Sequence, residues 1–382
     1  MNSHLPPASS PCRLRRWSLH CYTLPYLREV RWANAVESSG RYALLCIEDE
    51  AGRRGIAEGT LKDTWSGVSA RSLAAALEDI VMPRLTSVDL ADHGAVARAL
   101  EPLAENRMAR GLAQTACWTL AAALAGEPLW RLWGGSGVVD LTWTVTRQRP
   151  LAMAHEAAQV CERHGFRHLK VKGGQGRRVD LDALAEIRAA VGTGVACSVD
   201  ANSAYAISEA PAYLDALADA GVTMAEDPCP LAPDRAFEHL QARSQLPILI
   251  DRSCTSAMDA RLYLERGARA LSAKPARVGL GETRAISALA RSAGAQVAVG
   301  IYAESALGTL ISLQQAAAIE PSHSLAAEQT FFLGMAAQVC QSAPCILDGA
   351  VQLPATADLA AEVDWAAVQR HALCAPLQVL LG

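Results

Sequence analysis

Short apolar runs alternate with amphipathic stretches along the chain from about residue 139 onward. Such runs are typical of strands in a parallel sheet, and the stretches between them are typical of helices that pack on it. The predicted strands are 139–145, 168–172, 195–200, 223–226, 247–251, 270–274, 296–300 and 324–328. A helix is predicted in each of the seven gaps: 151–163, 181–191, 208–220, 235–243, 257–266, 282–292 and 306–319.

This regular alternation predicts an α/β fold in which a parallel sheet closes as a barrel. A doubly wound open sheet is the alternative. It would carry a glycine-rich phosphate loop after its first strand, and none follows Val145. Residues Gly173-Gly174-Gln175-Gly176 lack the GxGxxG spacing and indicate an ordinary loop.

The first third of the chain has a different pattern. Residues 42–48 alternate as a strand, residues 49–52 give a turn signal, and residues 55–58 resume as a second strand. Helices are predicted over 70–82, 96–103 and 109–124. This order of elements predicts a separate α+β domain ahead of the barrel, in keeping with a length of 382 residues.

Composition narrows the class of protein. A net charge of -4 gives no basic stripe for nucleic acid, and the apolar stretches are broken well before the ~18 residues of a membrane span. Residues 1–16 lack the apolar region of a secretory signal and are interpreted as a disordered or tagged lead-in. Eleven cysteines without a CxxC pair argue against a disulfide framework, so we expect a cytoplasmic protein with no nucleic-acid or membrane partner.

Lysine is rare in this chain. It occurs only at Lys62, Lys170, Lys172 and Lys274, and the other 31 of the 35 basic residues are arginine. Arginine keeps its proton in proteins, whereas lysine can be tuned to act as a base. Three of the four lysines fall on predicted strands of the barrel, which marks them as candidate functional residues.

Charged side chains end several of the otherwise apolar strands. Lys172, Asp200, Glu226, Asp251 and Lys274 are separated by 28, 26, 25 and 23 residues. Each gap is one strand–helix unit, so each side chain falls at the carboxyl end of a successive strand, and in a barrel these ends meet at one mouth. Charge at a buried strand end is costly unless it is paired or binds a metal.

The three carboxylates among these residues predict a divalent-cation site. Asp200, Glu226 and Asp251 supply the hard oxygen ligands that suit Mg²⁺. Asn202 lies two residues beyond Asp200 and shares its strand face. It is therefore a candidate auxiliary ligand or a donor that orients Asp200.

The lysines supply acid–base chemistry. Lys170 and Lys172 share a strand face, and two ammonium groups this close are expected to lower a pKa toward the range of a general base. Lys274 comes from the sixth predicted strand, so a substrate in the mouth would have a lysine on each face. The alternative is that the lysines only neutralise the acids. Removing a proton beside a carboxylate gives an enolate whose charge a metal stabilises, so the set predicts proton abstraction or the reverse addition.

In these segments the chain resembles the enolase superfamily, and within it the muconate-lactonising (muconate cycloisomerase) subgroup of the mandelate racemase/muconate lactonizing enzyme family. The resemblance covers about residues 40 to 335. The matching segments are Lys170-Val171-Lys172, Val199-Asp200-Ala201-Asn202, Glu226-Asp227-Pro228, Asp251, Lys274, Ala303-Glu304-Ser305 and Glu328.

The resemblance implies a modified TIM barrel, (β/α)7β, with an α+β N-terminal capping domain. The domains would be residues 1–137 for the capping domain, 138–330 for the barrel, and 331–382 for a segment that packs back on the capping domain. It also implies Mg²⁺ or Mn²⁺, a small carboxylate substrate and a homo-oligomer, from dimer to octamer.

The same resemblance implies roles for individual residues. Lys172 would be the principal acid/base, Lys274 the lysine on the opposite face, and Lys170 an electrostatic partner. Glu328 falls where cycloisomerases place an acid, and Glu304 belongs to a seventh-strand segment near the substrate. Substrate selection would come from capping loops over 26–34 and 62–65.

Two segments depart from the family pattern. The usual Asp-Glu-Ser at the third ligand reads Asp251-Arg252-Ser253, so an arginine replaces a glutamate. Arg252 is expected to neutralise an acidic pocket, to pair with a substrate carboxylate, or to weaken the metal site. The Gly-x-Gly-Glu of the capping domain reads Gly55-Ile56-Ala57-Glu58.

A Mg²⁺-dependent isomerase or lyase like muconate cycloisomerase is the leading hypothesis, with Glu328 as its distinguishing residue. N-acylamino-acid racemase or o-succinylbenzoate synthase activity is the alternative. A dipeptide epimerase would carry an Asp-x-Asp pair near the eighth strand, and a sugar-acid dehydratase a histidine near Val299; neither is present. A non-catalytic binding protein on the same fold is a further alternative.

Overall fold

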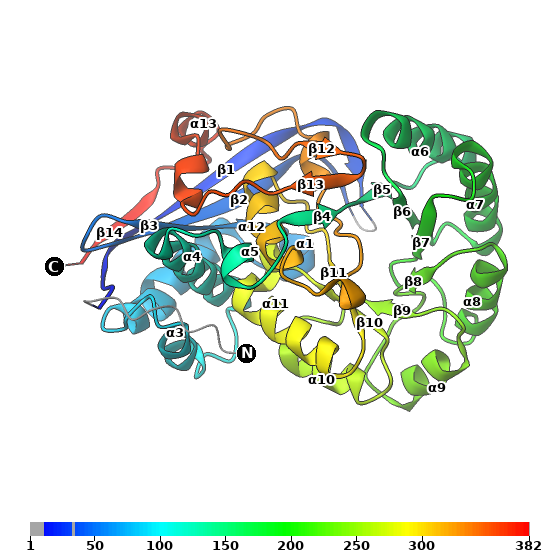
Figure 1. Ribbon diagram of the computed structural model, residues 1–382, viewed down its shortest axis with the longest axis horizontal. Helices are drawn as coiled ribbons and strands as arrows, with labels where there is room; N and C mark the ends of the chain where they lie inside the picture. The colour runs from blue at the N-terminus through cyan, green and yellow to red at the C-terminus, as the bar shows by residue number, and fades with distance from the viewer. Residues whose placement is uncertain (1–10, 33–34, 382) are drawn as a thin grey trace.

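The computed structural model describes residues 11–32 and 35–381. Figure 1 shows a curled sheet ringed by helices on one side of the molecule and a second domain of long strands and helices on the other. The curled sheet has seven parallel strands in the order β11-β10-β9-β8-β7-β6-β5. This arrangement confirms the predicted α/β barrel and excludes the doubly wound sheet, because neighbours in the sheet are also neighbours along the chain.

The barrel strands and helices follow the predicted alternation. The strands are β5 (Thr142–Val145), β6 (His168–Lys172), β7 (Ala196–Asp200), β8 (Met224–Glu226), β9 (Ile248–Ile250), β10 (Ala270–Ala273) and β11 (Gln296–Val299). The helices are α6 (Pro150–His164), α7 (Arg177–Val191), α8 (Ala210–Asp219), α9 (Arg235–Arg243), α10 (Ala257–Leu264), α11 (Pro275–Ser292) and α12 (Ala306–Ala316). Residues 173–176, between β6 and α7, form the predicted loop.

The predicted first and eighth strands need correction. Residues 138–145 split at Leu141, because β4 (Val138–Asp140) pairs antiparallel with β13 (Ala350–Gln352) instead of joining the barrel. The eighth segment makes only isolated parallel bridges, Ser324 to Val297 and Ala327 to Leu141. These bridges nevertheless join the two edges of the seven-stranded sheet.

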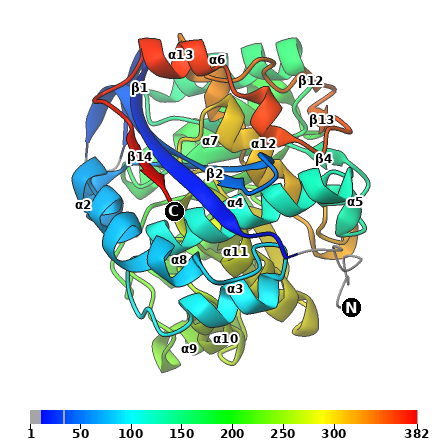
Figure 2. The ribbon, with the colours of Figure 1, turned by 90° about the vertical axis from the view of Figure 1, so that its left-hand side faces the viewer.

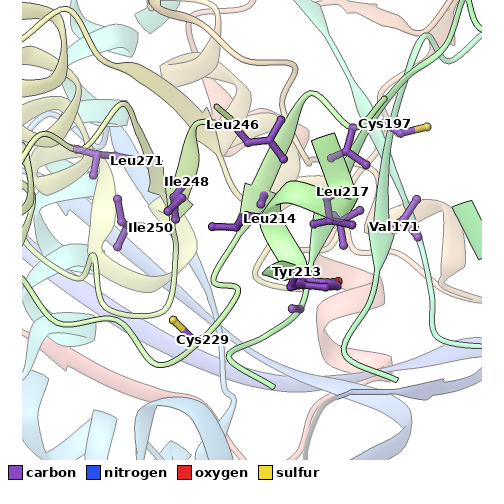
Figure 3. Close-up of a cluster of buried hydrophobic side chains, with 14 of the residues drawn as sticks. Val171, Cys197, Tyr213, Leu214, Leu217, Cys229, Leu246, Ile248, Ile250 and Leu271 are labelled. Carbon is purple, nitrogen blue, oxygen red and sulfur yellow. The ribbon is translucent and has the colours of Figure 1, made fainter. Parts of the chain in front are cut away.

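Apolar side chains fill the space between the sheet and its helices. Figure 3 shows part of this core, where Val171 and Cys197 from the strands face the same cluster as Leu214 and Leu217 from α8. Cys197 and Cys254 are buried and free, as small apolar residues would be.

The capping domain is built on an antiparallel sheet in the order β14-β1-β2-β3. Its strands are β1 (Leu14–Arg31), β2 (Val36–Asp49), β3 (Arg54–Thr60) and β14 (Leu377–Leu380). Its helical segments are α1 (Asp63–Ser66), α2 (Ala70–Ala75), a π-helical segment (Ala76–Val81), a 3-10 turn (Met82–Leu85), α3 (His93–Leu100), α4 (Arg107–Ala125) and α5 (Leu129–Leu132).

The predicted lead-in over 1–16 is wrong for its last residues. Cys12 is buried and its amide donates to Asp89, and β1 begins at Leu14, because Leu14, Trp17 and Leu19 all point into the core of the capping domain. Residues 1–10 lie outside the described part of the chain. In Figure 2, β1 crosses the face turned toward the viewer and β14 runs beside it.

The segment after residue 330 serves both parts of the molecule. Its β12 (Ile346–Leu347) and β13 extend β4, whereas its α13 (Trp365–Arg370) and β14 lie against β1. A 3-10 turn, Leu359–Glu362, contacts β3.

The two domains meet where α4 crosses α11. The chain kinks inside α11 at Gly279, whose φ is 85°, in the left-handed region that favours glycine. A Cβ atom at Gly279 would lie 2.4 Å from the Cα of Gly111, and one at Gly111 would lie 2.6 Å from the backbone of Val278. The two backbones are therefore in direct contact, which fixes the capping domain on the barrel.

Candidate active site

The charged residues at the strand ends lie side by side. In the parallel register, Lys172 is opposite Asp200, and Asp200 is opposite Glu226. Asp251 and Lys274 come directly after β9 and β10. All five side chains therefore come from five consecutive strands, β6 to β10, with β8 in the middle.

Each lysine in this group pairs with a carboxylate. Lys172 Nζ donates to Asp200 Oδ2 at 2.5 Å, and Lys274 Nζ donates to Asp251 Oδ2 at 2.6 Å. Lys170 is buried, and its Nζ donates to Glu226 Oε2 at 3.0 Å and to Glu328 Oε2 at 2.5 Å. Glu328 also accepts from the amide of Ile301 at 3.1 Å. The structure thus brings seven of the predicted residues together at the strand ends, in three hydrogen-bonded groups.

The predicted lowering of a lysine pKa is wrong for Lys170. Burial alone would lower the pKa of Lys170, but the carboxylates of Glu226 and Glu328 raise it well above its usual range. The sequence argument weighed only the neighbouring ammonium group of Lys172. The fold places two carboxylates closer, so the ammonium form is stabilised.

Negative charge exceeds positive charge in this buried region. The carboxylates are Asp200, Glu226, Asp227, Asp251, Glu304 and Glu328, and the ammonium groups are those of Lys170, Lys172 and Lys274. Burial and the neighbouring Asp200 raise the pKa of Glu226 well above its usual range, and burial and Asp251 raise the pKa of Asp227 to about 7. Such a region favours the binding of a cation.

The donor set fits a divalent cation. Asp200, Glu226 and Asp251 present hard oxygen atoms from adjacent strand ends, and Asp251 Oδ1 is buried without a hydrogen-bond partner within residues 11–32 and 35–381. As placed, no three acidic, histidine or cysteine side chains in the described residues converge tightly enough to hold an ion. Each of these three carboxylates is hydrogen-bonded to a lysine ammonium group.

Asn202 orients the first carboxylate. Its backbone amide donates to Asp200 Oδ1 at 2.7 Å, and its Nδ2 donates to Asp200 Oδ2 at 2.9 Å. This arrangement requires a left-handed backbone at Asn202, with φ of 50°. Both hydrogen bonds orient Asp200, as expected for one of the two roles that the sequence left open for Asn202.

Arg147 holds two strand ends together and was not predicted. Its Nε donates to the carbonyl of Gly173 at 2.6 Å, and its Nη2 donates to Asn202 Oδ1 at 3.3 Å. It thereby ties the loop after Lys172 to the segment after Asp200. The contacts depend on the fold, so an arginine following β5 carried no signal for them in an arginine-rich sequence.

Arg252 lies at the edge of this network. Its amide donates to Asp227 Oδ2 at 2.9 Å, but its side chain is exposed. Its guanidinium makes no ion pair with any residue that the structure describes. The expected neutralisation of the acidic pocket by Arg252 is therefore absent from this arrangement.

Glu304 and the loop that carries it close another side of the mouth. The Glu304 carboxylate is buried and accepts from the amide of Tyr302 at 2.7 Å and from Gln329 Nε2 at 3.2 Å. Burial raises its pKa to about 7. Ala303, between Tyr302 and Glu304, has a left-handed φ of 62°, which is strained for a residue with a Cβ atom.

The predicted capping loops form an aromatic cluster around Lys62. Lys62 is buried, its Nζ lies 4.4 Å from the ring centroid of Trp32 and 5.2 Å from that of Trp65, and it pairs with Glu37. The ring of Trp65 in turn packs on Tyr302, with centroids 5.3 Å apart. The loop over 62–65 therefore contacts the barrel mouth. Residues 33–34 of the other predicted loop lie outside the described residues.

Taken together, the fold and the strand-end network define a capped βα barrel with an acidic, lysine-flanked mouth. The sequence model of the family described as Enolase C-terminal domain-like matches residues 152–367. An N-succinylamino acid racemase of Thermus thermophilus is 31% identical over 319 residues, which span 80% of this chain and 82% of the racemase.

Solved structures give the same result for the fold. A muconate lactonizing enzyme from Pseudomonas fluorescens, complexed with muconolactone, has a TM-score of 0.87 at 21% identity and covers 95% of this chain and 100% of its own. A dipeptide epimerase from Cytophaga hutchinsonii, complexed with Mg and the dipeptide D-Ala-L-Val, has a TM-score of 0.82 at 21% identity, with coverages of 91% and 95%.

The chain belongs to the enolase superfamily, in its mandelate racemase/muconate lactonizing enzyme family. It is accordingly a divalent-metal-dependent enzyme of the isomerase type. Within the described residues, none of the helices has the length and apolar character needed to span a bilayer.

Proposed function

We propose that this enzyme is a Mg²⁺-dependent racemase of N-acylated amino acids, and that an N-succinylamino acid is a substrate. The supporting observation is the placement of Lys172 at the end of β6 and of Lys274 directly after β10, two strands to either side of Glu226 on β8. A substrate held at the central carboxylates would have one lysine on each face. Racemisation needs two such groups, because the proton leaves from one face and returns on the other.

The proton transfers are assigned to Lys172 and Lys274. Lys172 removes the α-proton from one face, and Lys274 delivers a proton to the same carbon from the other. In the reverse direction the two lysines exchange these roles. Lys170 stays protonated between Glu226 and Glu328 and adds positive charge beneath the substrate carboxylate. Water is kept out by the capping loop that carries Trp65.

Asp200, Glu226 and Asp251 would hold the cation, with Asn202 fixing the orientation of Asp200. When bound, Mg²⁺ or Mn²⁺ supplies charge neutralisation for the carboxylate of the substrate as its α-proton is removed. The net negative charge of the mouth favours a site that binds this cation over a site that relies on the lysines alone.

Muconate cycloisomerisation, the leading hypothesis from the sequence, is the second candidate. Glu328 at the end of the eighth segment and the likeness to muconate lactonizing enzymes support it. The racemase is favoured because Glu328 is already engaged by Lys170 and the Ile301 amide. Cycloisomerisation also requires only one lysine to transfer a proton.

The deciding experiment uses N-succinylamino acids in D₂O with Mg²⁺. The racemase proposal expects deuterium at the α-carbon together with loss of optical activity. Conversion of muconate to a lactone without α-exchange of the acylamino acids would replace it with the second candidate. Binding of Mg²⁺ with neither reaction would favour a non-catalytic binding protein.

We further propose a cytoplasmic location, the domain division at residues 137 and 330, and a homo-oligomer between dimer and octamer. The family resemblance supports these, as it supports a small carboxylate as the ligand. Light scattering of the purified protein tests the oligomeric state. A monomer at micromolar concentration would contradict it.

A further inference from the structure

A buried carboxylate of the capping domain reaches into the barrel. Glu58 lies on β3, and its Oε2 accepts hydrogen bonds from Ser305 Oγ and from the hydroxyl of Tyr22, both at 2.6 Å. Its Oε1 accepts from the amide of Ser305 at 3.3 Å. Ser305 is the N-cap of α12, the helix that follows the Tyr302–Glu304 segment. Glu58 therefore joins the two domains at this point.

The amino end of α12 offsets part of the cost of burying Glu58, although burial still raises the pKa of this carboxyl. No lysine, arginine or histidine of residues 11–32 and 35–381 forms an ion pair with Glu58. The buried carboxylate is therefore stabilised by its hydrogen bonds and by the dipole of α12. Gly308, in the first turn of α12, provides the room: a Cβ atom there would lie 2.5 Å from Glu58 Oε1. The carboxylate and the helix end fit each other closely.

The same contact fixes a strained segment, residues 303–305, in the loop that begins beside Lys274 at Gly300. The hydroxyl of Tyr42 donates to the carbonyl of Ala303 at 2.9 Å, so the capping domain holds both ends of the 303–305 segment. On its other side this loop begins at Gly300, where a Cβ atom would lie only 2.9 Å from Lys274 Cε. Movement of the segment would therefore displace the Glu304 carboxylate and the side chain of Lys274.

We propose that Glu58 is a positioning residue, which docks the capping domain on α12 and holds residues 302–305 against the Lys274 side of the active site. The effect that this role should have on reaction rates rests on the proposed racemase function. Lys274 directly follows β10, the strand that pairs with β11, whereas Lys172 ends β6, which is separated from β11 by β5 and the eighth segment across the barrel closure. The role of Glu58 is thus specific to one face of the substrate.

The test measures α-proton exchange separately for the two enantiomers of an N-succinylamino acid in D₂O. Lys274→Ala first identifies the enantiomer whose proton Lys274 removes. In Glu58→Gln, exchange of that enantiomer should fall by about tenfold or more, because small misplacements near the reacting atoms are costly. Exchange of the enantiomer handled by Lys172 should stay close to the wild-type rate. Equal slowing of both enantiomers, or no slowing, would overturn the inference.

A matched control is Glu48→Gln. Glu48 is a buried carboxylate of the same domain, paired with Arg16 and Arg54 and remote from α12. It should leave the ratio of the two exchange rates unchanged. If Glu58→Gln does not fold, Ser305→Ala breaks the same contact more mildly and should give the same selective loss.

Amide hydrogen exchange separates failure of this inference from failure of the proposed function. Protection of residues 302–308 should drop in Glu58→Gln and not in Glu48→Gln, whatever reaction the wild-type enzyme catalyses. Unchanged protection of these amides would overturn the inference. Absence of α-exchange in the wild-type enzyme would instead count against the racemase.

Discussion

The Nζ atom of Lys274 lies 2.6 Å from Oδ2 of Asp251, and this pair stands across β8 from the corresponding pair of Lys172 and Asp200. Each proposed base is therefore hydrogen-bonded to a proposed metal ligand. Burial would lower the pKa of Lys274, but Asp251 raises it. A carboxylate that gives its charge to a cation stabilises an ammonium group less, so cation binding and the basicity of the lysine are linked.

Removing either lysine should separate the two half-reactions. Lys172→Ala is expected to lower exchange of one enantiomer by about 10³-fold, the usual contribution of a general base, while the protein stays folded. Lys274→Ala should do the same for the other enantiomer. Proton NMR of each enantiomer in D₂O measures both rates. Substantial exchange of both enantiomers in Lys172→Ala would refute its role.

Mg²⁺ should stabilise the folded protein through the three carboxylates. At a Mg²⁺ concentration 100 times the Kd, linkage adds about 2.7 kcal/mol to the free energy of unfolding. Asp200→Asn and Glu226→Gln should abolish this gain in a thermal or urea titration. Glu48→Gln serves as the control and should keep it. An unchanged melting temperature of the wild-type protein on adding Mg²⁺ or Mn²⁺ would sink the metal site.

Arg252→Ala should leave the Mg²⁺-dependent stabilisation close to that of the wild type. The side chain is exposed, and the contact that ties this position to the site comes from its backbone amide to Asp227. Calorimetric titration with Mg²⁺ measures the effect. A large change in metal affinity would show that the guanidinium acts on the carboxylates after all.

Glu304 should make the metal-free protein less stable as pH rises. Its folded pKa of about 7 lies above the ordinary value of 4.5, so the folded state keeps a proton that the unfolded chain releases. Its contribution is greatest below pH 4.5, and about 3 kcal/mol is lost as pH rises to about 7. Urea unfolding across this range should show a smaller loss for Glu304→Gln than for the wild type. Parallel curves would contradict the assignment.

The α4–α11 crossing should tolerate no added side chain. Gly111→Ala places a methyl group against the backbone of Val278, which can yield only by moving the two domains apart. A loss of about 3 kcal/mol in the free energy of unfolding is expected. Gly194, which has open space around it, gives the control, since Gly194→Ala meets no atom within 4 Å. Similar melting temperatures for the two variants would show that the two helices can shift to accommodate the methyl group at little cost in stability.

The sequence predicted the barrel well because each strand–helix unit repeats one pattern. Helix α9 has the predicted bounds, Arg235–Arg243, and the strand-end residues follow from spacing alone. The long strand β1 could not be predicted in this way. It contains Pro25 and several charged residues, and a register shift between Pro25 and Val30 interrupts its pairing with β2. Such a strand lacks regular alternation along its length.

The electrostatics of the site depended on contacts that spacing does not reveal. The pKa of Lys170 rises because Glu226 and Glu328 approach it, 56 and 158 residues away along the chain. The contact of Glu58 with Ser305 spans 247 residues. The sequence marked Glu58 only as part of a variant motif, since its function depends on where β3 meets α12.

The pairing of β14 with β1 has a consequence for how the protein is made. Leu19 of β1 pairs with Leu377 of β14, so the capping sheet is completed by residues translated after the whole barrel. Until then, the outer edge of β1 is an unpaired strand edge, which can template association with another chain. The strand made first is thus covered last, and β1 is where nascent or truncated chains would be most prone to aggregate.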